Sequence, residues 1–159
     1  MAPAKGYKAV GGVESVALYP TQAVVAALFS SEGCEVEWSG ESPIKVTLMD
    51  DASRYEECSE CKNGIHTVAH LLHLVAERGD ADKWLTNDFV EQASLEGFVG
   101  VVSLCNGHRL LVGYSAEFKD EQPLRLESLT SSSGSRLAET PTVTLRLIAH
   151  DTDFSQEIL

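Results

Sequence analysis

The segment 98–115 constrains the fold of this 159-residue chain more than any other part of its sequence. Two largely apolar runs flank the dipeptide Asn106-Gly107. Asn-Gly supplies the two positive φ angles of a type I′ turn, so the pattern predicts a tight antiparallel hairpin. A two-residue loop pairs Val102 with Leu111 and makes both faces of the hairpin apolar. We therefore expect this hairpin at the centre of the fold, covered on each face by another layer.

Alternating polar and apolar residues predict further strands that bury one face each. These segments are 10–18, 35–38, 44–49, 124–127 and 142–147. A further segment, 65–78, fits both the helical and the strand period, so periodicity alone leaves its structure open. The turn-forming Asn63-Gly64 ahead of it favours a strand paired with the one that ends near Met49. The alternative is a helical hairpin formed with the helix that follows.

Two segments have helical patterns. The first is a helix of about residues 80–96, which Asp80 can cap and Gly97 can end. Its shared face consists of Ala81, Leu85, Phe89 and Ala93, and Thr86-Asn87-Asp88 can break it near the middle. The second is a short N-terminal helix over 21–28, which Thr21 can cap. Together the segments predict one α+β, mainly β domain over residues 1–159, an antiparallel β-sandwich with one flanking helix, a short N-terminal helix and a polar tail over 151–159.

Charge limits the partners of the chain. The chain has twenty-four acidic and twelve basic side chains, which gives a formal net charge of −12. Nucleic-acid binding depends on Lys and Arg displacing counterions from phosphates, so this balance argues against a protein that binds DNA. No apolar run approaches the roughly 20 residues that span a bilayer, and four cysteines are too few for a disulfide framework. The sequence predicts a protein made in the cytosol with reduced thiols and no membrane partner.

Four residues form the weak metal-site candidates of the sequence, namely Cys58, Cys61, His66 and His70. Thiolates and imidazoles are the usual zinc ligands, and Cys58 and Cys61 have C-x-x-C spacing. A second cysteine knuckle is missing, so we expect ordinary loop cysteines, with no metal and no cofactor.

No catalytic motif emerges. The chain lacks a phosphate-binding glycine loop, and its nearest approach to a nucleophile elbow, Gly113-Tyr114-Ser115-Ala116-Glu117, has Glu117 where the second glycine belongs. We expect a protein that is not an enzyme.

The stretch 50–64 is polar, acidic and without a period, which predicts a loop that is long for a simple connection. We expect it to contact another subunit through a set of residues near its start. They are Asp50, Asp51, Arg54, Tyr55, Glu56 and Glu57. A second loop begins at the serine-rich segment 131–135 and ends at Pro141.

Four motifs in the last two-thirds of the chain resemble those of small structural proteins from the tails of bacteriophages and prophages, the tail-tube family. They are Val68-Ala69-His70-Leu71-Leu72, Gly107-His108-Arg109-Leu110-Leu111-Val112-Gly113-Tyr114-Ser115, Glu121-Gln122-Pro123-Leu124-Arg125-Leu126 and Pro141-Thr142-Val143-Thr144-Leu145. The resemblance implies a β-sandwich with a helix beside it that forms stacked hexameric rings. It also implies an inter-ring loop at 50–64 and an acidic lumen through which DNA passes as unbound cargo. The expected location is the tail of the virion, assembled in the cytoplasm of the bacterial host.

Other interpretations stay open at this point. Related tail-completion and neck adaptor proteins share much of the same pattern. A small zinc- or ligand-binding module built on Cys58, Cys61, His66 and His70 belongs to a different functional class.

Overall fold

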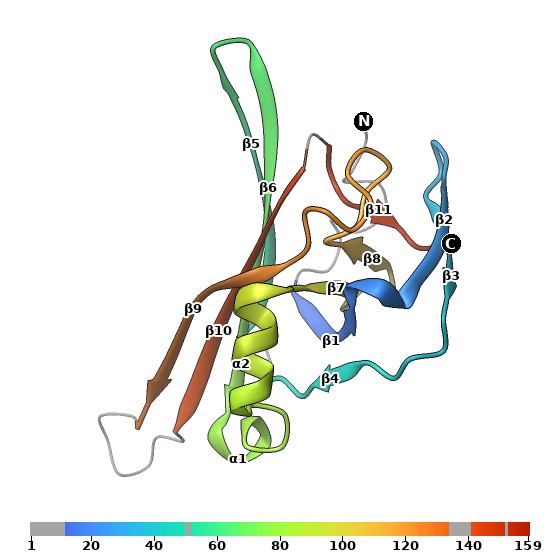
Figure 1. Ribbon diagram of the computed structural model, residues 1–159. Coiled ribbons are helices and arrows are strands. Elements are labelled where there is room, and N and C mark those ends of the chain that lie inside the picture. Colours follow the sequence, from blue (N-terminus) through green and yellow to red (C-terminus); the bar gives the residue numbers. More distant parts are fainter. Residues whose placement is uncertain (1–11, 50–51, 134–140, 152) are drawn as a thin grey trace.

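A computed structural model describes residues 12–49, 52–133, 141–151 and 153–159 (Figure 1). Its helices are few and its sheets antiparallel, as the sequence predicts for a mainly β sandwich. The elements are β1 (Val13–Pro20), the 3-10 helix η1 (Thr21–Ala23), β2 (Val24–Phe29), β3 (Cys34–Trp38), β4 (Ile44–Val46), β5 (Arg54–Lys62), β6 (Ile65–Glu77), α1 (Arg78–Ala81), α2 (Asn87–Leu95), β7 (Phe98–Leu104), β8 (Arg109–Val112), β9 (Arg125–Ser132), β10 (Thr142–Asp151) and β11 (Gln156–Glu157).

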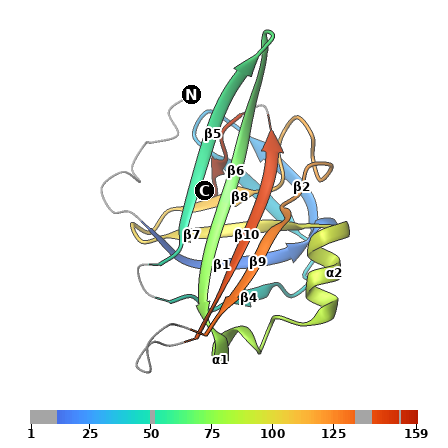
Figure 2. The ribbon, with the colours of Figure 1, turned by 90° about the vertical axis from the view of Figure 1, so that its left-hand side faces the viewer.

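Two sheets pack face to face. One has the strand order β11-β8-β7-β1-β4 and the other β5-β6-β10-β9. Figure 2 shows the four-stranded sheet in front, with β7 and β1 running across its strands behind it. The hairpin of β2 and β3 lies at the other side of the molecule, beyond the five-stranded sheet (Figure 1).

The core lies between the two sheets. Alternate residues of β6 and β10 are buried against β1 and β7, as expected for strands with one solvent-facing side. They include Leu72, Leu74, Val143, Leu145 and Leu147. The helical segment closes one end of this core, where the Phe89 ring lies 5.3 Å from Phe98 and 5.2 Å from Trp84 between ring centroids.

The predicted break in the helix over 80–96 is confirmed, but the cap is not where it was expected. Asp80 lies inside the four-residue α1, and a second helix, α2, begins at Asn87. Thr86 caps it, because its side-chain oxygen accepts a hydrogen bond of 3.1 Å from the Phe89 amide.

The helix predicted over 21–28 is wrong. Only one 3-10 turn forms, and the chain continues as strand β2, which pairs with β3. Val24 and Val25 are β-branched and stiff in a helix, and the pairing with β3 decides between the two states.

Segment 65–78 is a strand as predicted, but its partner differs. β6 pairs with β5 and not with the segment that ends near Met49. Asn63 and Gly64, with φ of 53° and 77°, form the turn between β5 and β6. Residues 54–62 therefore form a strand where the sequence predicts a loop, because their period is hidden by polar side chains on both faces.

The central hairpin forms, but its predicted register is off by one residue. Val102 pairs with Leu110 instead of Leu111. The loop has three residues, because the Leu104 amide donates to the carbonyl of His108 and the Gly107 amide donates back to Leu104. Gly107 alone has a positive φ there, which is the geometry of a type I turn followed by a bulge. Both faces are buried all the same, so the hairpin lies centrally as expected.

The C-terminal segment is not a free polar tail. β10 continues to Asp151, β11 pairs with β8, and the Leu159 amide donates to the carbonyl of Cys34. Of the serine-rich loop, Ser131 and Ser132 belong to β9, and residues 134–140 lie outside the described part of the chain.

Gly113 and Gly107 provide a matched pair for a stability test. Both have φ near +90°, but a Cβ on Gly113 would lie 2.8 Å from the carbonyl oxygen of Phe98, whereas one on Gly107 meets nothing within 4 Å. We expect Gly107→Ala to cost about 1 kcal/mol of unfolding free energy for the left-handed backbone, and Gly113→Ala roughly 2 kcal/mol more. Urea denaturation measures both. Equal losses of unfolding free energy would show that the close contact at Gly113 does not destabilise the Gly113→Ala variant.

Candidate functional site

The β5–β6 hairpin projects beyond the body of the molecule (Figure 1). β5 pairs with β6 from Arg54 to Lys62, but β10 accompanies β6 only as far as Val68. The last three residue pairs and the turn therefore form a two-stranded ribbon, residues 60–67, which we call the projecting ribbon. All of its residues are exposed.

The projecting ribbon is weakly held by its own contacts. An isolated two-stranded hairpin is marginally stable in water, because neither face is covered. The ion pair between Lys62 and Glu60, 3.5 Å long, is exposed and contributes little. At the tip, the Ile65 side chain is 66% exposed. An apolar side chain at the end of a bare ribbon is a candidate contact for a partner.

A polar cluster anchors the base of this hairpin to the C-terminal segment. The Tyr55 hydroxyl lies 3.1 Å from Nδ1 of the buried His70 and 3.0 Å from Oγ of Ser155. Nε2 of His70 lies 2.9 Å from the carbonyl oxygen of Asp153. Because a carbonyl oxygen only accepts, this nitrogen carries a proton and donates it. The cluster joins residues up to 100 positions apart and aligns the hairpin with the body.

Glu57 completes the cluster. Its carboxylate accepts a 2.7 Å hydrogen bond from the Ser155 amide and lies 3.9 Å from Nε2 of His70. Burial raises the pKa of Glu57 above its usual value, although the hydrogen bonds from Ser155 and the charge of His70 act in the opposite direction.

The six residues predicted to contact another subunit do not form one loop. Arg54 and Glu56 lie on the outer face of β5 and form an ion pair of 2.5 Å. Tyr55 and Glu57 point to the inner side, into the anchoring cluster. Asp50 and Asp51 lie outside the described residues.

The candidate metal ligands do not come together. Cross-strand partners share a face, so Cys61 and His66 lie on one side of the hairpin while Cys58 points to the other. His66 and His70 share a face but lie four residues apart along a strand, roughly 13 Å, which is too far for one ion. His70 is already engaged in the anchoring cluster. Among the described residues no group of three His, Cys, Asp or Glu side chains could hold a metal.

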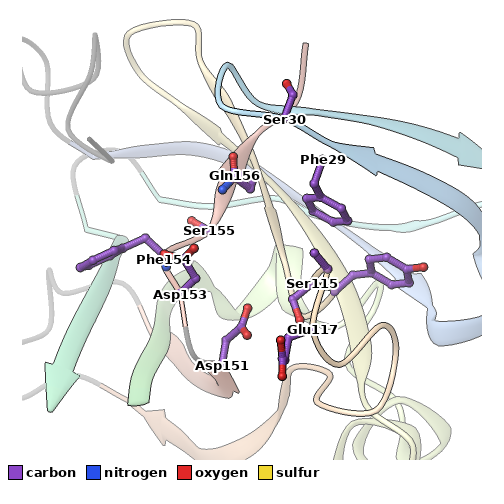
Figure 3. Close-up of a pocket in the computed structure, with 11 residues that line it drawn as sticks. Phe29, Ser30, Ser115, Glu117, Asp151, Asp153, Phe154, Ser155 and Gln156 are labelled. Atoms are coloured by element: carbon purple, nitrogen blue, oxygen red, sulfur yellow. Dashed lines mark hydrogen bonds between the residues drawn. The ribbon is translucent and has the colours of Figure 1, made fainter. Parts of the chain in front are cut away.

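A cavity of about 260 Å³ opens between β2, the segment after β8 and the C-terminal segment (Figure 3). The stacked rings of Phe29 and Tyr114, with centroids 6.3 Å apart, form one wall. Glu117, Asp151 and Asp153 contribute carboxylates on the other side. The sequence did not reveal this cavity, because its walls come from three segments that meet only when β11 docks on β8.

Ser115 lines this cavity. Its hydroxyl accepts a 3.0 Å hydrogen bond from the Phe118 amide and closes a turn. Tyr114 lies beside it, and burial followed by the charge of Asp120 raises the pKa of this phenol, which favours its neutral form. The geometry offers negative charge and an aromatic wall, and it disfavours anionic ligands.

Comparison with protein-family models, with curated proteins and with solved structures yields no match to this chain. No helix in the described ranges is long and apolar enough to cross a membrane.

The raised pKa of Glu57 predicts a pH dependence of stability. A group whose folded pKa exceeds its unfolded value contributes stability that is full below its usual pKa, 4.5, and is lost as pH rises through the folded value. Glu57→Gln keeps an acceptor for Ser155 but cannot ionise. We expect its melting temperature relative to the natural chain, measured from pH 4.5 to pH 7.5, to rise with pH until the pH passes the folded pKa of Glu57. A constant difference over this range would contradict the burial of a charged Glu57.

Proposed function

We propose that this protein is a structural subunit of a phage tail, tube-like in form, that acts by assembly and performs no catalytic step. Copies of the chain form stacked hexameric rings around an acidic lumen through which DNA passes. The subunit works in the virion tail and is assembled in the cytoplasm of the bacterial host. The projecting ribbon, residues 60–67, is the observation that carries this proposal.

The ribbon supports assembly for an energetic reason. A two-stranded extension with no third strand and no covering layer gains little free energy in an isolated subunit. When the ribbon docks on a neighbouring ring, that ring covers Ile65 and the backbone edges of β5 and β6. The anchoring cluster of Tyr55, His70 and Ser155 holds the base of the hairpin, so the ribbon reaches outward in one direction.

The charge of the chain supports DNA as a cargo. At −12, the surface repels phosphates, and a lumen lined by such subunits gives DNA no strong binding site. We expect no binding of double-stranded DNA by the purified protein, measured by fluorescence anisotropy at 50 mM and 150 mM salt. Binding that weakens steeply with salt would reveal a basic surface and contradict the passage of free DNA.

Assembly itself is the direct test. We expect a concentration series in light scattering to show masses far above 17.2 kDa, and negative-stain microscopy of the same fractions to show rings and stacked tubes. A strict monomer at every concentration would overturn the proposal. Single rings that never stack would instead favour a tail-completion or neck protein.

A shortened hairpin separates stacking from ring formation. Residue pairs along an antiparallel ladder alternate between hydrogen-bonded and non-hydrogen-bonded types. Deletion of two successive pairs, Cys61 with His66 and Lys62 with Ile65, therefore leaves the Asn63-Gly64 turn closed by a pair of the original type. We expect this variant to form rings that no longer stack, counted by microscopy.

A point substitution provides the matched control for this deletion. Ile65→Ser removes the exposed side chain of the ribbon tip and is expected to shorten the tubes. Leu95→Ser removes an equally exposed leucine, 67% against 66%, from helix α2 and is expected to leave tube length unchanged. Equal tube lengths for the two variants would exclude the ribbon tip from the contact.

A further inference from the structure

The outer face of the four-stranded sheet is uncovered. Figure 2 shows β5, β6, β10 and β9 with no described helix or strand in front of them. The register places side chains in rows across this face. One row joins Arg54, His73 and Arg146, and the next joins Leu71 and Ile148, with Ala69 and Val75 on either side along β6.

Charge distinguishes this face from the rest of the molecule. It carries four of the twelve basic residues but only four of the twenty-four acidic ones. These are Arg54, Lys62, Arg125 and Arg146, against Glu56, Glu60, Glu77 and Glu127. The face is therefore neutral in a chain of charge −12. Another copy can approach here without the repulsion that opposes contact elsewhere.

His73 is half-buried in the middle of this row. Burial, followed by the charges of Arg54 and Arg146, lowers the pKa of His73, so this ring is neutral between the two arginines. Nδ1 of His73 is buried and has no hydrogen-bond partner. The row thus presents two guanidinium groups beside an apolar strip, and each is paired with a glutamate of the same face, Arg54 with Glu56 at 2.5 Å and Arg146 with Glu127 at 3.5 Å.

The β2–β3 hairpin carries the complementary pattern. Its inner face packs on Val99 and Leu111, while its outer face presents Ala26 opposite Glu37 and Leu28 opposite Glu35. Leu28 is 72% exposed. Residues 24–38 contain three glutamates and no Lys or Arg. An apolar strip therefore lies beside an acidic strip, whereas the sheet face has arginines beside its apolar strip and is neutral overall.

The two surfaces lie on opposite sides of the molecule. Figure 1 shows the four-stranded sheet on the left and β2 and β3 on the right, and Figure 2 places the same hairpin behind the sheet. Complementary surfaces on opposite sides of one subunit produce head-to-tail contacts, which close into rings when the rotation between copies allows it.

We propose that neighbouring subunits of a ring meet head to tail, with the acidic outer face of β2–β3 of one copy on the Arg54–Arg146 face of the next. This inference rests on the proposed function, because it assigns the lateral contact of the same assembly. Leu28 packs against Leu71 and Ile148, while Glu35 and Glu37 approach Arg54 and Arg146.

Charge exchange tests the contact. Arg54→Glu with Arg146→Glu places like charges opposite each other, and Glu35→Lys with Glu37→Lys does the same from the other side. We expect each double variant to sediment as a monomer. The variant with all four substitutions keeps the net charge of −12 and restores rings, because the attraction is re-established with reversed signs. Its recovery also shows that the substituted chains fold.

Leu28→Glu and Leu95→Glu form the matched control pair, since both leucines are similarly exposed. The first is expected to abolish ring formation and the second to leave it intact. Two outcomes would show that the head-to-tail contact is wrong while the proposed function stands. In the first, the natural chain and the double variants form rings equally well. In the second, the natural chain forms rings, but the variant with all four substitutions is folded and stays monomeric. If the natural chain forms no rings, the proposed function itself fails.

Discussion

The pairing of β6 with its two neighbours is the interaction on which the rest of the structure depends. β6 pairs with β10 over ten residue pairs and with β5 over nine. Its inner face supplies Leu72 and Leu74 to the core, and its outer face supplies Leu71 and His73 to the uncovered surface. Since side chains alternate along a strand, one element serves both purposes without conflict. Beyond Val68 the same strand leaves the core and becomes half of the projecting ribbon.

The anchoring cluster explains how such a long hairpin keeps its direction. Tyr55, His70 and Ser155 join the hairpin to the segment between β10 and β11 by buried polar contacts. Buried polar groups that are all satisfied hold a geometry more specifically than apolar contacts do, because a shift leaves one of them without a partner. Burial of this cluster has an energetic cost at Glu57, because withdrawal from water disfavours the charged carboxylate and raises its pKa.

Much of the fold could be predicted because its strands carry a clear period. The central hairpin, β6 and β10 were predicted from alternating or continuous apolar residues, and the break before α2 from Thr86 and its neighbours. Three strands were missed, β2, β5 and β11, the last because it lies in a segment predicted as a polar tail. β2 has the composition of a helix and becomes a strand by pairing with β3, while β5 is polar on both faces where it leaves the core. The register of the central hairpin differed because Asn106-Gly107 forms part of a three-residue loop.

By itself, the sequence determined the mainly β class, the strand periods, the turn at Asn63-Gly64 and the strong negative charge. These properties depend on neighbouring residues or on simple sums over the chain. Only the tertiary structure decided that β11 docks on β8, that the candidate metal ligands stay apart and that a neutral and an acidic face lie on opposite sides. Such relations join residues distant in the chain, and they follow from how the sheets pack and which edges remain open. No local pattern contains that information.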